Sequence, residues 1–247
     1  SILKQESTKF DWIYSDPSRR DDAGGKVFKL SDCEPNIPKH LDELLKNGKR
    51  ILLKTSPLLD ITAGLRELKY VTEIHIVAIN NDVKELLWII DPELNSPTEL
   101  ITVNFKADNK EEFRAKLTQE PLAQVNYSIA LNYLYEPNSA LMKSGLFNTI
   151  GEQYNLFKLH QNSHLYTSEQ LMEFSGRRFK ILEVLPFHKK TLKRIFKNTK
   201  ANITTRNFPL TVSQIKTTLQ LKDGGFSYLF FTTQNQTNKV VLVCEKI

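Results

Sequence analysis

The sequence has few of the residues that build metal sites or disulfide frameworks. Its 247 residues include only 2 cysteines, Cys33 and Cys244, which are too few and too isolated for a disulfide framework or a zinc site. Among the 5 histidines, only His160 and His164 have a spacing that metal ligands use, and they lie in a polar stretch without a carboxylate nearby. We therefore expect reduced cysteines and no bound metal.

Long apolar runs are missing as well. No run approaches the roughly 18 residues of a membrane-spanning helix, and the first residues lack the charged and then apolar order of a signal peptide. These absences predict a cytoplasmic protein with no membrane contact. The apolar content of 40% and the charged content of 25% are typical of globular proteins, and the length allows two or three small cores.

Glycine is scarce where nucleotide-binding folds need it. None of the 9 glycines forms a Gly-x-Gly cluster after a predicted strand, and the pairs Gly24-Gly25 and Gly224-Gly225 lie in turns between polar residues. A glycine-rich turn after a strand lets the backbone approach a bound nucleotide closely. The sequence therefore contains no such turn.

The most informative motif is Asp16-Pro17-Ser18-Arg19-Arg20, which directly follows residues 10–15. Those residues are rich in aromatic and β-branched side chains and precede a proline, which predicts a buried strand that stops at Asp16. An acidic residue at the carboxyl end of a strand faces the crevice where open α/β sheets bind ligands. An Asp-Pro step is also ordinary turn chemistry, so the motif alone leaves both interpretations open.

The next hundred residues alternate between strands and helices. Residues 37–45 and 60–68 predict helices, and a further apolar segment spans residues 83–90. Strands are predicted at residues 49–55, 73–79 and 100–105. Such alternation is typical of a layered α/β unit.

Four short motifs together resemble the second half of a class I S-adenosylmethionine-dependent methyltransferase: Asp16-Pro17-Ser18-Arg19-Arg20, Lys26-Val27-Phe28, Lys54-Thr55-Ser56-Pro57, and Asp82-Val83 leading to Leu87-Trp88. The closest likeness is to bacterial predicted methyltransferases with a carboxyl-terminal THUMP-like domain, and it covers nearly the whole chain. The resemblance implies a partial Rossmann-like sheet in residues 1–105. It also implies that the catalytic residues Asp16, Pro17, Ser18 and Arg19 meet the target base and the methyl donor, and we expect Arg20 and Lys54 to bind the substrate.

In that family the donor is bound by a glycine-rich turn after the first strand and an acidic residue after the second. Both features would precede Ser1, so the sequence is expected to be a fragment that lacks the donor-binding half. We expect the chain alone to bind S-adenosylmethionine poorly and to be inactive, with the missing half as a candidate partner.

The chemistry that we expect is direct methyl transfer to a base nitrogen or to an oxygen, because transfer needs little more than alignment of the acceptor. Asp16 can accept a hydrogen bond from an exocyclic amine, and Arg19 and Arg20 can pair with a phosphate or stack on a flipped base. The alternative for the two arginines is an ion pair with Asp21 or Asp22 that anchors the loop.

A covalent route is the competing mechanism. RNA 5-methyluridine enzymes have a similar Asp-Pro-Pro-Arg loop and use a cysteine nucleophile after the following strand. Here the corresponding positions hold Thr55 and Ser56, which lack the nucleophilicity of a thiol near neutral pH. Cys33 is expected in a different loop, so the sequence disfavours the covalent route.

Charge divides the chain unevenly. From Gly176 onward there are 14 lysines and arginines against 3 acidic residues, whereas the part before has 20 against 25. We therefore expect a separate α+β domain at residues 176–247, with elements in the order β-α-β-α-β-β. This region also resembles the THUMP-like domain of the same family, which implies that it binds RNA.

The helix expected at residues 188–197 carries its charges on one face. Leu192, Ile195 and Phe196 form an apolar stripe that we expect to be buried. The solvent-facing set, proposed to contact RNA, is Lys189, Lys190, Lys193, Arg194 and Lys197. Such a face suits phosphates, and the alternative is that it only keeps the domain soluble.

Residues 106–175 are expected to form a small ferredoxin-like connecting region, because Glu136-Pro137-Asn138 resembles segments found there in the family. A short helix is predicted from residue 135, with Gly145 just past its end. Glu136 then either lines the active site or interacts with the helix dipole.

The sequence as a whole predicts part of an RNA methyltransferase. The alternative from another class is a noncatalytic RNA-binding or assembly module whose Rossmann-like part is only a scaffold, and likeness of fold does not decide between the two.

Overall fold

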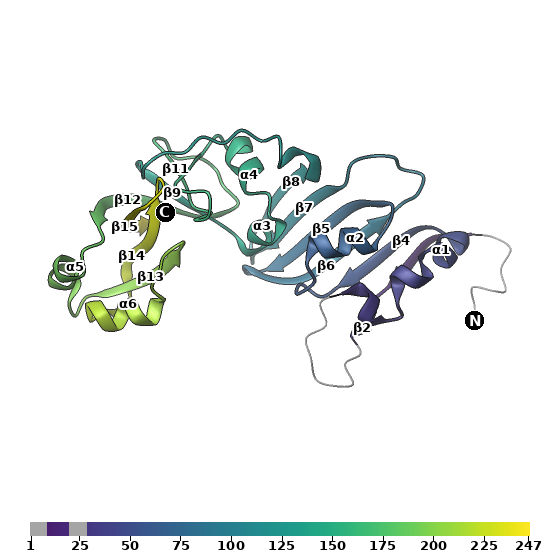
Figure 1. Ribbon diagram of the computed structural model, residues 1–247, viewed down its shortest axis with the longest axis horizontal. Coiled ribbons are helices and arrows are strands. Elements are labelled where there is room, and N and C mark those ends of the chain that lie inside the picture. The colour runs from purple at the N-terminus through teal and green to yellow at the C-terminus, as the bar shows by residue number, and fades with distance from the viewer. Residues whose placement is uncertain (1–8, 20–28) are drawn as a thin grey trace. The chain divides into compact units, whose positions relative to one another are not determined.

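The computed structural model describes residues 9–19 and 29–247, which form two compact units (Figure 1). The first unit comprises the residues up to Glu120 together with Ser139–Leu146, and the second comprises Pro121–Asn138 and Phe147–Ile247. Several residues of the expected site, Arg20 and Lys26-Val27-Phe28, lie outside the described residues, as do Asp21 and Asp22. Of Arg19 only the backbone is described.

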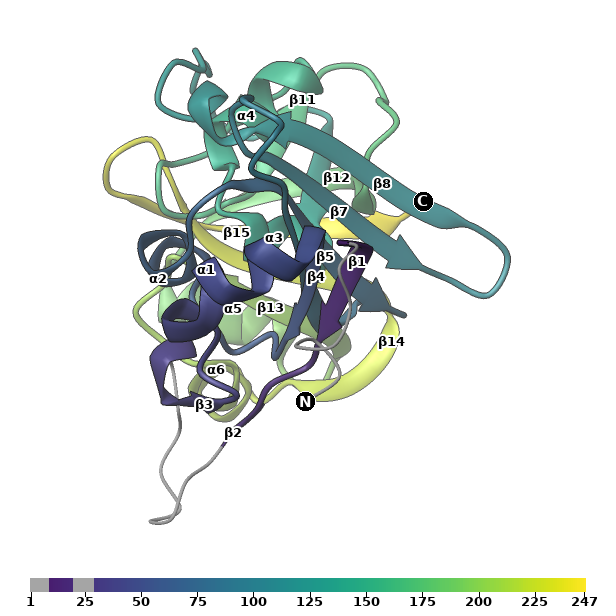
Figure 2. The ribbon, with the colours of Figure 1, turned by 90° about the vertical axis from the view of Figure 1, so that its right-hand side faces the viewer.

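The first unit is built on a six-stranded mixed sheet (Figures 1 and 2). In spatial order its strands are β1 (Phe10–Ser15), β4 (Gly48–Thr55), β6 (Asp82–Ile90), β5 (Val71–Ile79), β7 (Glu99–Phe105) and β8 (Lys110–Lys116). β1 is parallel to β4 and β5 is parallel to β7, while the other neighbouring pairs are antiparallel. The mixed α/β character agrees with the sequence prediction, and the segment at residues 83–90 belongs to strand β6.

The boundary expected after residue 105 falls inside this sheet. β7 and β8 form an antiparallel hairpin, visible in Figure 2, in which Phe105 pairs with Lys110. Because β8 completes the sheet, the first unit continues to Glu120.

One face of the sheet carries the core of the first unit. Alternate residues of a strand point to the same face, and Leu53, Ile74 and Trp88, which neighbour one another across β4, β6 and β5, are fully buried. Helix α2 (Ile61–Glu67) packs so closely here that a Cβ added to Gly64 would lie 2.5 Å from the Trp88 ring. Helix α1 (Ile37–Asn47) contacts β4, and α3 (Ser139–Ser144) contacts β5, β6 and β7.

Short polar signals fix where the helices begin. The side chain of Asn36 accepts a hydrogen bond of 3.0 Å from the Lys39 amide at the start of α1, and Asp60 accepts one of 2.8 Å from the Ala63 amide at the start of α2. Two 3-10 helices, η2 (Leu30–Asp32) and η3 (Leu117–Gln119), and a two-stranded sheet of β2 (Ser18–Arg19) and β3 (Cys33–Glu34) complete the described part of this unit.

The second unit is built on a seven-stranded sheet. Its strands in spatial order are β10 (Phe157–Lys158), β11 (Tyr166–Ser168), β9 (Tyr133–Pro137), β12 (Gly176–Pro186), β15 (Asn238–Lys246), β14 (Lys222–Gln234) and β13 (Lys200–Arg206). Its helices are α4 (Phe147–Gln153), α5 (Lys189–Phe196) and α6 (Val212–Leu219). The order from β12 to β15 agrees with the predicted β-α-β-α-β-β arrangement.

Helices α5 and α6 cover one face of this sheet. Leu192 of α5 and Ile215 of α6 pack with Phe231 and Val241 of the strands in one buried cluster. The other face packs against residues that precede Gly176, and β9 pairs directly with β12. The connecting region and the basic region therefore share one sheet. None of the helices in the described residues has the length and apolar character needed to span a membrane.

Candidate functional site

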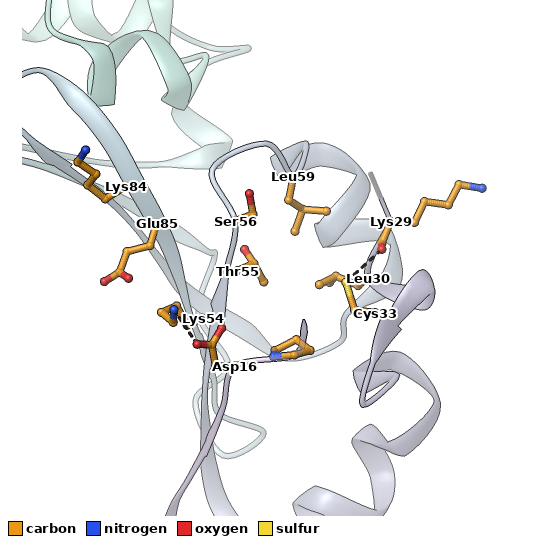
Figure 3. Close-up of a pocket in the computed structure, with 11 residues that line it drawn as sticks. Asp16, Lys29, Leu30, Cys33, Lys54, Thr55, Ser56, Leu59, Lys84 and Glu85 are labelled. Carbon is orange, nitrogen blue, oxygen red and sulfur yellow. Dashed lines mark hydrogen bonds and ion pairs between the residues drawn. The ribbon is translucent and has the colours of Figure 1, made fainter. Parts of the chain in front are cut away.

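The candidate site is a pocket of about 230 Å³ in the first unit (Figure 3). β1 and β4 are parallel neighbours, with Ser15 beside Leu53, so their carboxyl ends meet at one edge of the sheet. Asp16 and Pro17 follow β1, Thr55 ends β4 and Ser56 follows it; all four line the pocket. The expected motif and the loop after the second predicted strand thus come together at the edge where open α/β sheets bind ligands.

Asp16 is held by Lys54 from the neighbouring strand. The Lys54 Nζ atom lies 2.7 Å from Asp16 Oδ2, and the two side chains are 31% and 47% exposed. The hydrogen bond with Asp16 raises the pKa of Lys54, so the lysine stays charged at neutral pH. The predicted substrate-binding lysine is therefore engaged with the predicted catalytic carboxylate (Figure 3).

The other members of the motif lie differently. Pro17 is buried and lines the pocket. Ser18 lies outside the pocket lining, and its hydroxyl donates a hydrogen bond of 3.3 Å to the Glu34 carbonyl. This bond supports the pairing of β2 with β3, in which Ser18 lies opposite Glu34 and Arg19 opposite Cys33.

That pairing corrects the expectation for Cys33. The sequence places it in a different loop from the active-site residues, but the β2–β3 pairing brings it into the lining of the same pocket as Thr55 and Ser56. The Cys33 Sγ atom lies 3.6 Å from the carbonyl oxygen of Lys29 (Figure 3). A pairing between two-residue strands leaves no periodic signal in the sequence, so the contact was missed.

Thr55 and Ser56 have structural contacts of their own. Thr55 is 7% exposed, and its hydroxyl accepts a hydrogen bond of 2.9 Å from the Trp88 indole nitrogen. The Ser56 hydroxyl accepts one of 3.2 Å from the amide of Leu58, which shapes the turn after β4. Lys143 of α3 donates a hydrogen bond of 2.8 Å to the Leu59 carbonyl, and burial lowers its pKa. These contacts hold in place the wall of the pocket that Thr55, Ser56 and Leu59 form.

Sequence reasoning missed two residues that line the pocket, Lys84 and Glu85 of β6. β6 runs antiparallel to β4, with Leu86 beside Thr55, so the residues that precede Leu86 lie next to the end of β4. A confident strand assignment for residues 83–90 is the signal that would have found them.

The five cations predicted to contact RNA are all exposed in the second unit: Lys189, Lys190, Lys193, Arg194 and Lys197. Leu192 and Phe196 are buried, as expected, but Ile195 is 44% exposed. The apolar stripe is therefore narrower than predicted, because Ile195 lies about 100° around the helix from Phe196.

Glu136 also differs from its expectation. It lies in strand β9 and not at the start of a helix, and its side chain is 5% exposed. Arg177 Nε donates a hydrogen bond of 2.7 Å to Glu136 Oε2, and Arg206 Nη2 donates one of 3.0 Å to Oε1. Glu136 thus anchors two arginines within the second unit. The predicted helix begins only at Ser139, as α3, and Gly145 follows its end with a φ of 74°.

Comparisons with known proteins agree with this architecture. Residues 133–174 match the model of a ferredoxin-like domain family, and residues 176–246 match the model of a THUMP domain-like family. A comparison with curated proteins found no match. The chain is also similar to the crystal structure of a presumed methyltransferase from Porphyromonas gingivalis W83, with 35% sequence identity and a TM-score of 0.87.

This similarity covers 96% of the present chain and 59% of the Porphyromonas protein. The chain therefore spans less than two thirds of the length of the relative that it matches. The likeness extends over both units, and the two family matches together cover most of the second unit.

Proposed function

We propose that this chain is part of an S-adenosylmethionine-dependent RNA methyltransferase that transfers a methyl group by direct displacement to a base nitrogen or to an oxygen. The observation that carries the proposal is the meeting of Asp16 with the loop after β4 at the carboxyl ends of two parallel strands. The similarity to a presumed methyltransferase supports the reaction class, and the THUMP-like match supports RNA as the partner.

In this proposal Asp16 orients the acceptor. Its carboxylate accepts a hydrogen bond from the exocyclic amine of a base, which directs the nitrogen lone pair toward the methyl group. Lys54 is a positioning residue, because its ion pair of 2.7 Å fixes the direction of the Asp16 carboxylate. S-adenosylmethionine supplies the methyl group when it is bound. Alignment of the two reactants accounts for most of the catalysis.

The size of the pocket favours a donor site that this chain shares with another part of the full-length protein. A volume of about 230 Å³ is below the roughly 300–1,000 Å³ of pockets that enclose a drug-sized ligand. The pocket, as the described residues line it, therefore has the size of a base or of one end of the donor. We infer that the glycine-rich turn and the acidic residue that hold the rest of the donor lie outside this chain.

The edge of the first sheet supports the same inference. Among the described strands β1 lies at one edge of the sheet, and it carries Trp12 and Tyr14, which are 47% and 59% exposed. Parallel strands are normally covered on both faces, and open edges are normally blunted by charge or proline. We propose that further strands of a Rossmann-like sheet continue from β1 in the full-length protein.

The remaining parts of the proposal concern the second unit. We propose a ferredoxin-like connecting region followed by a THUMP-like domain at residues 176–247, which holds RNA through the basic face of α5. We also propose that the protein acts in the cytoplasm, where RNA is available to it.

The direct test is Asp16→Ala in the full-length protein, measured by transfer of radiolabelled methyl groups to RNA. We expect loss of transfer with a nearly unchanged melting temperature, since a half-exposed carboxylate after a strand supports little packing. The matched control is Asp11→Ala, because Asp11 lies on β1, the strand that precedes Asp16, and pairs with Lys49 at 2.7 Å without lining the pocket. Equal activity of the two variants would remove Asp16 from the reaction.

A full-length protein that binds RNA and shows no methyl transfer, in either the wild type or the variants, would instead favour a noncatalytic RNA-binding module.

A further inference from the structure

A second pocket, of about 790 Å³, lies entirely within the second unit. One wall is the tip of the β14–β15 hairpin, and the other comes from residues that precede Gly176. The lining residues are Tyr127, His160, Gln161, Asn235, Gln236, Thr237 and Asn238. The lining contains an aromatic ring, an imidazole and several amide side chains, but no carboxylate, lysine or arginine.

Backbone hydrogen bonds tie both walls to one segment. Lys158 donates to the Asn126 carbonyl at 2.9 Å and accepts from the Ser128 amide at 3.0 Å, which fixes Tyr127 between them. The Asn235 amide donates to the Leu159 carbonyl at 2.9 Å, which fixes the hairpin tip. The opening between the walls is therefore set by the main chain and is largely preformed.

Tyr127 offers a stacking surface. Its side chain is 52% exposed although it lies in this structured pocket. Lys158 is only 2% exposed, and its Nζ atom lies 5.9 Å from the centre of the Tyr127 ring. The same atom donates a hydrogen bond of 2.9 Å to Asn148 Oδ1. The buried cation holds the ring in place and leaves exposed ring surface for a flat ligand.

His160 is fixed in one tautomer. Its Nδ1 atom accepts a hydrogen bond of 3.0 Å from the Asn162 amide, which can only donate, and lies 2.9 Å from the Asn207 side-chain nitrogen. The neutral ring therefore carries its proton on Nε2, which is left as a donor. Asn235, Gln236 and Asn238 add exposed amides that can both donate and accept.

We propose that this pocket binds an unpaired nucleobase of RNA, stacked on Tyr127 and hydrogen-bonded at its edge by the amides of the hairpin tip. A nucleobase is flat, uncharged and rimmed by donors and acceptors, which matches a lining of the same character. Amide side chains pair with base edges through two hydrogen bonds at once. The inference rests on the proposed RNA partner, but it concerns a different site from α5 and from the pocket beside Asp16.

The test compares the whole chain, 1–247, with its Tyr127→Ala variant by fluorescence anisotropy. The probes are a labelled 12-nucleotide single-stranded oligoadenylate, the matching oligouridylate, and a fully paired 12-base-pair RNA duplex. Stacking on an aromatic side chain contributes about 1–3 kcal/mol per base, so affinity for single strands should fall about 5- to 140-fold. Affinity for the duplex should stay unchanged, because its bases are paired and stacked.

Two control variants test whether the loss of affinity comes from the Tyr127 ring and not from the removal of any exposed tyrosine. Tyr127→Phe keeps the ring and should retain single-strand affinity. Tyr70→Ala removes a tyrosine of equal exposure, 52%, from the first unit and should also leave affinity unchanged. The slope of affinity against salt should be the same for Tyr127→Ala and the wild type, because stacking releases no counterions.

An unchanged single-strand affinity in Tyr127→Ala, or an equal loss of affinity for the duplex, would refute base binding by this pocket. The proposed phosphate contact of α5 would be unaffected by that result. A wild-type chain that binds none of the three RNA probes would overturn the inference together with the proposed RNA partner.

Discussion

The basic face of helix α5 makes a quantitative prediction about salt. The perturbation is the double variant Lys190→Ala with Arg194→Ala, which removes two cations one turn apart on the exposed side of the helix. Leu192 and Phe196, which anchor α5 to the core, are 0% and 9% exposed and are not touched. Alanine also favours the helix, so the fold should be retained.

The magnitude follows from counterion release. Each phosphate contact with a single strand contributes about 0.7 to the slope of log affinity against log salt. Losing two contacts should therefore make the slope shallower by about 1.4. Between 50 and 200 mM salt, the ratio of wild-type to variant affinity should shrink about 7-fold.

The assay is fluorescence anisotropy with the same single-stranded probes over a salt series, on the chain 1–247. The matched control is Lys39→Ala with Lys46→Ala, two exposed lysines of α1 in the first unit, which should keep the wild-type slope. Equal slopes for the α5 variant and the wild type would refute the phosphate contact. An equal change in the α1 variant would show that net charge alone, and not the face of α5, determines binding.

The remaining predictions concern thiols and carboxylates. Burial raises the pKa of the Cys244 thiol to about 12, so a maleimide at pH 7 should label only the half-buried Cys33 in the native chain, as mass spectrometry can show. Direct transfer predicts that Cys33→Ser in the full-length protein keeps its methylation activity, and its loss would favour a covalent route. Glu136→Gln should lower the free energy of unfolding by about 1–3 kcal/mol in denaturant titrations, because two part-exposed arginines lose their counterion. Hydrogen bonds from lysine and arginine neighbours lower the pKa of Glu112 to about 2 from a usual 4.5. Its stabilisation is therefore complete above about pH 4.5 and is lost toward pH 2, where wild type and Glu112→Gln should converge in thermal unfolding.

The sequence was most informative where a segment carries its own periodic signal. The strands and helices from β12 to β15 follow from alternating and helical apolar patterns. The turn of the β14–β15 hairpin, at residues 235–238, consists of polar residues that are typical of turns. The meeting of Asp16 with Thr55 and Ser56 was also predictable, because two parallel strands must end at one edge of their sheet. In these cases local pattern and tertiary structure agree.

The failures share a different physical origin. Glu136 precedes a proline and an asparagine that are typical of a helix start, yet pairing of β9 with β12 and β11 places it in a strand. Lys84 and Glu85 enter the pocket through the antiparallel pairing of β6 with β4, and Cys33 enters through the pairing of β3 with β2. Each position depends on a partner strand far away in the sequence, and strand pairing overrides local propensity.

The two sites in the second unit would contribute to RNA binding in different ways. In the proposed function the face of five exposed cations acts through released counterions, so it should bind single and double strands alike and weaken steeply with salt. The pocket at Tyr127 has no charged lining residue, so it should add affinity that salt hardly changes and that only an unpaired base can reach. Because one contribution varies with salt and the other with strand pairing, a salt series on paired and unpaired RNA separates them. The difference in affinity between unpaired RNA and the duplex that does not change with salt therefore measures the contribution of the pocket.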